Sequence, residues 1–241
     1  MRAPGPETVF SVSPPESATP ELRDNPLAEY FFRNSVRLIH KWHHYFEIYH
    51  RHFARFRGRA PVLIEIGVQH GGSLQMWRHY FGDGARIVGI DVDERCRGFA
   101  DEGTTILIGD QADRRFLAGL REQFPRVDIV IDDGGHTMAQ QITTFQELYP
   151  HVQPRGVYVC EDLHTSYQPH WGGGLGRPGT FIEVAKLLVD RLHAWYYTAP
   201  GEPLDDFALG AYSLNFYDSM LVIEKRPISQ PRSSMVGRPS F

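Results

Sequence analysis

Short apolar runs that alternate with helical segments constrain the fold of this chain more than any other feature of its sequence. Each run is rich in Val and Ile, and most of them end at or just before a Gly or an acidic residue. The runs are residues 62–66, 86–91, 105–108, 127–132 and 157–160. Runs of this length are typical of parallel strands that are buried on both faces. With helices between them, they predict an α/β fold with a doubly wound, Rossmann-like and mostly parallel sheet.

The segments on either side of these runs have their own patterns. Apolar residues recur at helical spacing from Pro26 to about Arg57, which predicts one long amphipathic helix that Gly58 ends. Thr180 and Glu183 have the spacing of a capping box, so a helix should begin there. Two late runs, near residues 209–216 and 220–224, are joined by a tight turn and predict an antiparallel hairpin at the edge of the sheet.

The length of 241 residues is enough for one domain with a sizeable core. We expect a flexible Pro-rich arm over residues 1–25 and an N-terminal helical segment over 26–58. The main domain should cover residues 59–228, and a tail should cover 229–241.

Composition limits the partners and the compartment that we expect. A formal net charge of −4 gives no electrostatic reason to bind nucleic acid or an anionic membrane. The chain has no apolar run near the ~20 residues that span a bilayer, and its N-terminus lacks the apolar stretch of a signal peptide. Cys96 and Cys160 are its only cysteines, so we expect a protein of the reducing cytoplasm without a disulfide framework.

A Gly-rich turn follows the first predicted strand. Its residues run from Glu65 through Gly67 to Ser73, where a helix begins. Glycines let a backbone approach a ligand closely, and a helix N-terminus favours a negative group. The turn departs from G-x-G-x-x-G, so by itself it fits an ordinary βα turn equally well. Asp91 ends the next strand and could bind ribose hydroxyls. Asp110 and Gln111 follow the third strand, where Gln111 could read an adenine edge, so we expect a nucleoside ligand.

Acidic residues and a histidine follow the fourth and fifth predicted strands. Asp133 lies three residues before His136, and Glu161 and Asp162 follow the next run. The carboxyl ends of strands are where an open α/β sheet binds its ligands. Crowded carboxylates repel each other unless a hard cation such as Mg²⁺ lies among them. Asp132 should face the opposite side of its strand, so we give it no ligand role.

Taken together, these motifs resemble a known family. Ile64-Glu65-Ile66-Gly67-Val68 with Gly71-Gly72-Ser73, Ile131 to His136, and Glu161 to Tyr167 are similar to the class I S-adenosylmethionine- and Mg²⁺-dependent sugar O-methyltransferases. The similarity is greatest to the catalytic domain of the branch that methylates macrolide deoxysugars, the mycinamicin type. It covers roughly residues 41–225, and we expect no counterpart of the separate N-terminal auxiliary domain of the mycinamicin enzyme.

The resemblance implies a function and a role for each motif. Asp133, Glu161 and Asp162 would bind Mg²⁺, and His136 would be the general base. The acceptor would be a small-molecule glycoside, methylated on a sugar hydroxyl during antibiotic biosynthesis. S-adenosylmethionine would contact the residues of the first three strand ends together with the first metal ligand. These are Glu65, Gly67, Ser73, Asp91, Asp110, Gln111 and Asp133.

Several alternatives stay open at this point. The acceptor could be a polyketide phenol, a surface glycan or a β-lactam, and a metal-dependent hydrolase or an inactive scaffold could carry the same acidic residues. Residues 168–179 are Gly-rich, and we favour a mobile lid over a disordered connector. His164 and Tyr167 could line the acceptor pocket. His40, His43 and His44 are expected at the surface or an interface rather than on zinc. The aromatic helix before Gly58 suggests a homo-oligomer.

Overall fold

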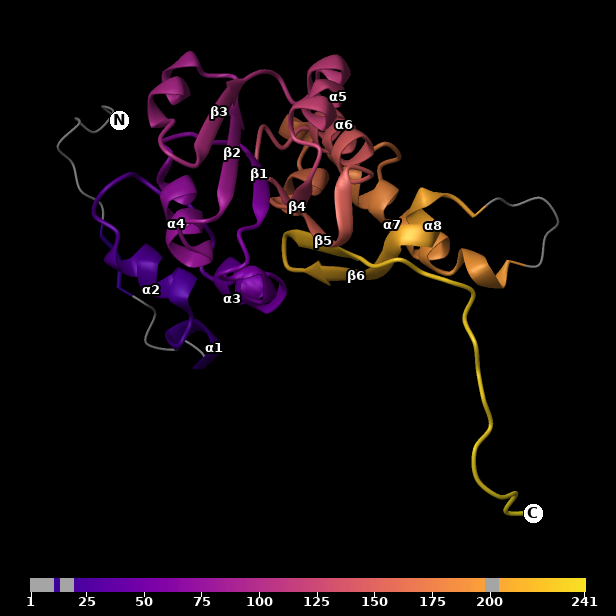
Figure 1. The fold of residues 1–241 in the computed structure, drawn as a ribbon. Helices are drawn as coiled ribbons and strands as arrows, with labels where there is room; N and C mark the ends of the chain where they lie inside the picture. Colours follow the sequence, from indigo (N-terminus) through magenta and orange to yellow (C-terminus); the bar gives the residue numbers. More distant parts are fainter. Residues whose placement is uncertain (1–10, 14–19, 198–203) are drawn as a thin grey trace.

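The computed structural model describes residues 11–13, 20–197 and 204–241, which form a sheet with helices on both faces (Figure 1). The strands are β1 (Val62–Ile66), β2 (Arg86–Asp91), β3 (Thr104–Ile108), β4 (Val127–Asp132), β5 (Val152–Cys160), β6 (Ala211–Tyr217) and β7 (Met220–Lys225). The α-helices are α1 (Pro20–Arg23), α2 (Pro26–Arg33), α3 (Tyr45–Phe53), α4 (Gly72–Phe81), α5 (Arg114–Gln123), α6 (Met138–Leu148), α7 (Phe181–Leu192) and α8 (Asp206–Gly210). Short 3₁₀ helices are η1 (Ala54–Phe56), η2 (Glu94–Phe99), η3 (Leu163–Tyr167), η4 (Pro169–Trp171) and η5 (Ala194–Tyr196).

The described strands form one sheet in the order β3-β2-β1-β4-β5-β7-β6. Neighbours from β3 to β5 pair in parallel, whereas β7 pairs antiparallel with both β5 and β6. The prediction of a doubly wound, mostly parallel sheet with an antiparallel C-terminal hairpin is confirmed. The chain order reverses beside β1, where β2 lies on one side and β4 on the other. An α/β sheet opens a crevice for ligands at such a point.

Alternate strand residues face two separate cores. Leu63, Ile87 and Ile129 pack under α2, α3 and α4, whereas their neighbours Ile64 and Val88 pack under α5, α6 and α7. Figure 1 shows these two helical layers on opposite sides of the sheet. Side chains buried on both faces explain why the central strands are apolar at every position rather than at alternate ones.

The prediction of one long helix from Pro26 to Arg57 is wrong. The structure has α2 and α3 there, separated by residues 34–44, which form no helix. Asn34 ends α2, because its amide donates to the Arg37 carbonyl oxygen at 2.7 Å and its side-chain oxygen accepts from the Val36 N–H. Apolar periodicity continued through this segment, but local hydrogen bonds of Asn competed with the helix.

The predicted helix after Thr180 is present, but its capping box is not. The Thr180 hydroxyl donates to the Arg177 carbonyl oxygen instead of capping α7, and Glu183 pairs with Lys186. A complete capping box occurs at the start of α6, between Thr137 and Gln140. The same residue spacing therefore gives different local structures, depending on where the preceding loop directs the hydroxyl.

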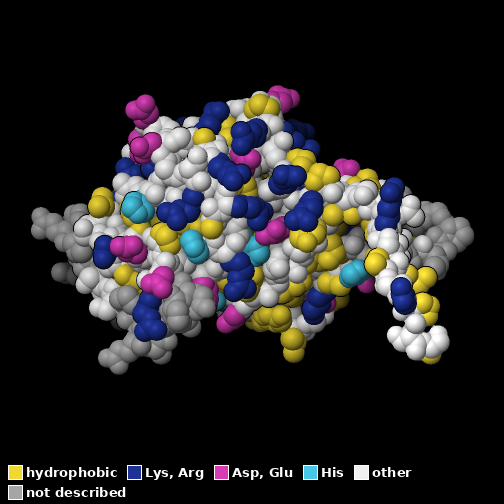
Figure 2. Space-filling model, turned by 60° about the horizontal axis from the view of Figure 1, so that its bottom comes forward, with side chains coloured by type: hydrophobic (Ala, Val, Ile, Leu, Met, Phe, Trp, Pro, Cys, Tyr) yellow, Lys and Arg dark blue, Asp and Glu magenta, His cyan; other side chains and the backbone are white. Residues whose placement is uncertain are grey.

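The two ends of the chain differ from its middle. Residues 1–10 and 14–19 of the expected N-terminal arm lie outside the described residues, whereas α1 packs beside α2 and α3. The C-terminal tail extends away from the sheet without regular structure (Figure 1). Basic side chains spread across the face shown in Figure 2, interspersed with acidic and apolar ones. Among the described residues, no helix is both long and apolar enough to cross a membrane.

Candidate active site

A cavity of about 680 Å³ lies at the carboxyl ends of β1, β2, β4 and β5. The turn after β1 and Asp91 line one part of it, and the acidic residues after β4 and β5 line another. Residues Leu38 to Trp42, from the non-helical segment between α2 and α3, form a further wall. The cavity therefore connects the two predicted half-sites, the Gly-rich turn and the acidic cluster.

Gly67 allows the loops after β1 and β4 to touch. A Cβ atom at this position would lie 1.9 Å from the Asp133 carbonyl oxygen, and the Gly67 φ of 94° is one that other residues rarely adopt. The Gly67 N–H donates to the Ile90 carbonyl oxygen at 2.8 Å, which fixes the turn against β2. This glycine is needed because two backbones meet there, and it lines the cavity.

Asp91 lines the cavity and also shapes it. Its Oδ2 atom accepts hydrogen bonds from the Val68 and Gln69 N–H groups, each at 2.9 Å, and its Oδ1 accepts one from the Asp93 N–H. A carboxylate can accept about four hydrogen bonds, so one more acceptor position is free of these backbone donors. Backbone N–H groups thus fix the orientation of the Asp91 carboxylate at the cavity.

Three of the predicted cofactor contacts have partners within the chain. Glu65 is fully buried and does not line the cavity, since its oxygens accept from Ser73 Oγ at 2.7 Å and Trp77 Nε1 at 2.9 Å. Asp110 is exposed outside the cavity, where it accepts from the Ala112 N–H in a local turn. Gln111 reaches the cavity lining, but its amide is already used within the chain.

The hydrogen bonds of Gln111 fix the loop after β4. Its amide nitrogen donates to Asp132 Oδ1 and Thr144 Oγ1, and its oxygen accepts from the Gly135 N–H at 2.6 Å. Asp132 is completely buried, which raises the pKa of its carboxyl to about 7. Gln111 thus supports the Gly134–Gly135 loop instead of presenting its amide to an adenine, and Asp132 faces away from the ligand groups as expected.

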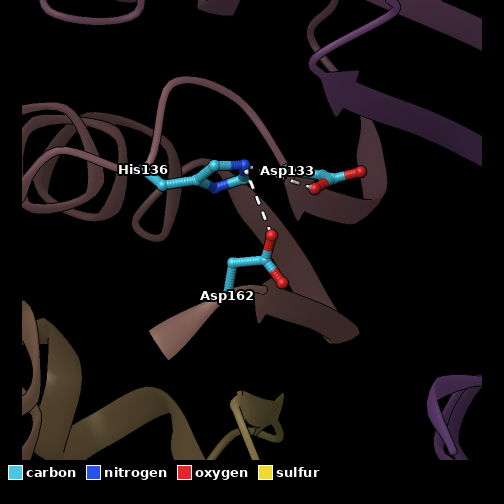
Figure 3. Close-up of side chains that lie close together, drawn as sticks. All are labelled: Asp133, His136 and Asp162. Atoms are coloured by element: carbon cyan, nitrogen blue, oxygen red, sulfur yellow. Dashed lines mark ion pairs between the residues drawn. The ribbon is translucent and has the colours of Figure 1, made fainter. Parts of the chain in front are cut away.

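His136 lies between two carboxylates at the acidic end of the cavity (Figure 3). Its Nε2 atom is 3.5 Å from Asp162 Oδ2 and 3.8 Å from Asp133 Oδ1. The three side chains offer ligand atoms within 4.8 Å of one another, and all three are partly exposed to the cavity. The other ring nitrogen, Nδ1, is buried without a hydrogen-bond partner among the described residues. Two anions and one imidazole therefore converge on a small accessible space.

Glu161 is close by but has different partners. Its side chain is almost fully buried, and its oxygens accept from the Lys41 ammonium at 2.9 and 3.1 Å and from the Tyr49 hydroxyl at 2.5 Å. The same ammonium donates to Asp133 Oδ2 at 2.5 Å. Burial alone would lower the pKa of Lys41, but the carboxylates of Asp133 and Glu161 raise it above its usual range, so its charge is retained.

The sequence did not reveal three residues of this site. Lys41 and Tyr49 bind Glu161, and the Tyr45 hydroxyl lies 2.9 Å from Asp162 Oδ1. The sequence pattern predicted only that Tyr45 and Tyr49 belong to the aromatic helix before Gly58. A signal existed for Lys41, because only three of the 25 basic residues are lysines. Its ammonium is a compact charge with three donors, which can pair with several carboxylates at once.

Most of the other candidate residues do not line the cavity. His164 Nδ1 is hydrogen-bonded to Ser219 Oγ, and neither it nor Tyr167 lines the cavity. Residues 168–179 include η4 and several backbone hydrogen bonds, and Trp171 of that segment lies edge-on to His136 with ring centroids 5.9 Å apart. His40, His43 and His44 form no metal-binding group among the described residues, although His40 does line the cavity.

One stretch of the chain, which carries the ends of β1, β2, β4 and β5, matches a known family. Residues 64–163 match the family model described as a methyltransferase domain. This stretch runs from β1 to the acidic pair after β5, so it contains both half-sites of the cavity.

Comparison with individual proteins identifies the relatives as sugar O-methyltransferases. The 8-demethyl-8-alpha-L-rhamnosyl tetracenomycin-C 2'-O-methyltransferase of Streptomyces olivaceus is 39% identical over 197 residues, which cover 77% of this chain and 52% of that protein. The mycinamicin VI 2''-O-methyltransferase of Micromonospora griseorubida is 38% identical over 166 residues, covering 64% and 40%. The resemblance to sugar O-methyltransferases of the macrolide type is confirmed.

A solved structure supports the same relationship. MycE methyltransferase from the mycinamycin biosynthetic pathway, in complex with Mg, SAH and mycinamycin VI, superposes with a TM-score of 0.71 at 32% identity. The match covers 88% of this chain and 55% of that chain. This chain spans about half the length of the curated relatives that it matches.

Proposed function

We propose that this chain is an S-adenosylmethionine- and Mg²⁺-dependent O-methyltransferase that acts on a sugar hydroxyl of a glycosylated natural product. One observation carries the proposal. A single cavity joins Gly67 and Asp91, which suit a nucleoside, to a cluster of carboxylates around His136. The relatives named for methyl transfer to sugars of tetracenomycin and mycinamicin support this acceptor class.

The cofactor half of the cavity fits an adenosine. Asp91 presents a carboxylate whose backbone hydrogen bonds leave room for a ribose hydroxyl, and Gly67 places no side chain at the start of the turn. S-adenosylmethionine supplies an electrophilic methyl group when bound, and the protein needs only to orient it. Ser73 lines this half as well, and its Oγ donates a hydrogen bond to Glu65.

The acidic half fits a hard divalent cation. Asp133 and Asp162 direct carboxylate oxygens into the same accessible space, and oxygen ligands are those that Mg²⁺ prefers. We assign these two as ligands, and keep Glu161 as a proposed third ligand that is engaged by Lys41 in this structure. A bound cation would lower the pKa of a coordinated sugar hydroxyl and hold it in one orientation.

His136 is the residue that we propose to accept the hydroxyl proton. Its Nε2 atom faces the same space as the two carboxylates, so a hydroxyl bound there would lie within reach of the ring. The carboxylates of Asp133 and Asp162 would then stabilise the imidazolium that forms. Trp171 lies next to His136 in an edge-to-face contact.

The competing functions explain less of the structure. A metal-dependent hydrolase could use the acidic cluster, but it would leave the half of the cavity at Gly67 and Asp91 without a ligand. An inactive scaffold would not need a histidine held between two carboxylates. A phenol, a surface glycan or a β-lactam would use the same residues, and the sugar is favoured because the compared relatives are named as sugar O-methyltransferases.

Calorimetric titration with S-adenosylhomocysteine tests the cofactor assignment. We expect Asp91→Ala to weaken binding by about 1.5–3 kcal/mol, because a charged hydrogen-bond acceptor is lost. Asp110→Ala is the matched control and should bind normally, since Asp110 lies outside the cavity. Asp91→Asn keeps the size of the side chain and separates the loss of charge from a collapse of the turn. Equal affinities for the wild type and the Asp91 variants would remove Asp91 from the site.

A further inference from the structure

Lys41 places a permanent positive charge inside the acidic cluster. Its side chain is 2% exposed, and its ammonium lies 2.5 Å from Asp133 Oδ2 and 2.9 Å from Glu161 Oε2. Glu65 Oε1 is a third anion at 4.0 Å. Three carboxylates from the ends of β1, β4 and β5 thus surround one buried cation that belongs to the protein itself.

The position of Lys41 does not depend on its ion pairs alone. The segment that carries it is packed against α4 so closely that a Cβ at Gly72 would lie 2.4 Å from the Leu38 carbonyl oxygen. The Arg37 guanidinium lies over the Phe99 ring at 4.8 Å, and Asn34 binds the Arg37 carbonyl oxygen. Replacing the ammonium should therefore change the charge of the site while these backbone contacts persist.

The ammonium interacts with two of the carboxylates that we propose for the divalent cation. A cation that binds Asp133 and Glu161 must share their charge with Lys41, or displace it, because like charges repel across a few ångströms at a site shielded from water. Without Lys41 the same carboxylates would repel each other and would bind a divalent cation more tightly. The buried ammonium thus lowers the net negative charge that an incoming metal encounters.

We propose that Lys41 is a positioning residue of the metal site that holds Glu161 and Asp133 together as an internal counter-ion and weakens the affinity of the site for Mg²⁺. This inference rests on the metal site of the proposed function. It makes metal binding readily reversible, while Asp162 and His136, which Lys41 does not contact, stay open to the cation and the acceptor. In the absence of metal, the ammonium keeps the carboxylates in place.

Titration of Mg²⁺ alone into the purified protein tests the proposal without turnover. Lys41→Gln and Lys41→Met remove the charge, and we expect both to bind Mg²⁺ on the order of tenfold more tightly than the wild type. Lys41→Arg keeps the charge and should restore an affinity near that of the wild type. Lys186→Met is the matched control, since Lys186 is exposed and pairs only with Glu183 in the described contacts.

Thermal denaturation with and without Mg²⁺ gives a second measurement. The neutral variants should melt lower than the wild type without metal, because buried carboxylates lose their partner, and Mg²⁺ should raise their melting temperature more than it raises that of the wild type. If Lys41→Met folds only when Mg²⁺ is present, the cation has replaced the ammonium, which supports the proposal. If Lys41→Met fails to fold with and without Mg²⁺, the Mg²⁺ affinity and the melting temperature of Lys41→Gln test the proposal instead.

Two results would overturn the inference in different ways. Unchanged or weaker Mg²⁺ binding by the folded neutral variants would show that Lys41 does not act on the metal, and the proposed function would stand. No Mg²⁺ binding by the wild type or any variant would overturn the metal assignment itself, and with it the role of Lys41. Binding of S-adenosylhomocysteine, measured on the same samples, would then show whether the cofactor assignment survives.

Discussion

Two of the three residues labelled in Figure 3 have a positive φ, in the left-handed region of backbone conformation. His136 has a φ of 56° and Asp162 a φ of 55°, although neither is a glycine. Such conformations cost on the order of 1–3 kcal/mol and persist where the surroundings impose them. Here the Thr165 hydroxyl donates to the carbonyl oxygens of both His136 and Asp162. Local strain is thus found at the residues to which we assign the chemistry.

His136→Ala tests the base. We expect the catalytic rate to fall on the order of 10²–10⁴-fold, the usual range for losing a general base. Binding of S-adenosylhomocysteine should change little, since the histidine lies at the acidic end of the cavity. His193→Ala, at an exposed position, is the control. Near-normal turnover of the His136 variant from pH 6 to pH 9 would mean that another group takes the proton.

Gly67→Ala tests the close approach of the two loops. Gly82 is the matched control, because its φ of 91° is almost the same as that of Gly67 but nothing lies within 4 Å of an added Cβ. We expect Gly82→Ala to cost on the order of 1–3 kcal/mol of unfolding free energy, and Gly67→Ala to cost about 1–3 kcal/mol more because its Cβ meets Asp133. Chemical denaturation measures both. Equal losses of unfolding free energy in the two variants would show that the positive φ sets the cost, and that the contact with Asp133 does not.

At the scale of the elements, the sequence predicted the strands far better than the N-terminal helices. The strands Val62–Ile66, Arg86–Asp91 and Val127–Asp132 have the predicted bounds, because short runs of buried apolar residues mark central strands. The expected long helix failed because Asn34 ends α2, and because residues 34–44 then carry Lys41 into the acidic cluster. That contact spans 92 positions in the sequence, so no local pattern could predict it.

Contacts between residues far apart in the sequence also limited the prediction of the site. Strand ends predicted that Asp133, Glu161 and Asp162 would lie together, because the ends of parallel strands share one edge of the sheet. The side-chain direction of Gln111 was not predictable, since it depends on Asp132 and on Thr144 of a helix 33 residues later. The partners of Glu65 were not predictable for a similar reason, because Trp77 on the next helix binds its carboxylate.

The contact between α3 and the C-terminal hairpin should depend on pH. His52 is buried, Nδ1 lies 2.7 Å from Glu224 Oε1, and Nε2 lies 2.9 Å from the Tyr217 hydroxyl. Burial lowers the pKa of His52 below its usual 6.5. The unfolded chain then binds the proton more readily, so the stability that neutral His52 contributes is present above about pH 6.5 and is lost as the pH falls below it.

Denaturation at a series of pH values checks this expectation. The free energy of unfolding of His52→Gln should fall less than that of the wild type between pH 7 and the pKa of folded His52. His193→Gln, at an exposed position, should follow the wild type. His50 and His151 also have lowered pKa values through burial, so part of the fall should persist in the His52 variant. Identical curves for the His52 variant and the wild type would exclude His52 as a source of the pH dependence.

At the scale of the whole molecule, the structure changes the argument for self-association. The aromatic residues of α3 that suggested an oligomer are Tyr45, Phe46, Tyr49 and Phe53, and all are buried within the chain itself. Trp42 is still 51% exposed, beside the cavity that it lines. A homo-oligomer stays a prediction without that support, and light scattering at micromolar concentration tests it. A mass near 27.5 kDa would count against it.

We propose, above all, that one cavity brings a methyl donor to a sugar hydroxyl held by a bound cation. The most direct test is transfer of a labelled methyl group from S-adenosylmethionine to rhamnosylated and deoxysugar-bearing polyketides. We expect label on the sugar in the presence of Mg²⁺, none after EDTA treatment, and recovery when Mg²⁺ is restored. Asp133→Ala and Asp162→Ala should lose most of the transfer while they remain folded. Transfer that continues undiminished in metal-free buffer, or label on the aglycone alone, would contradict the account.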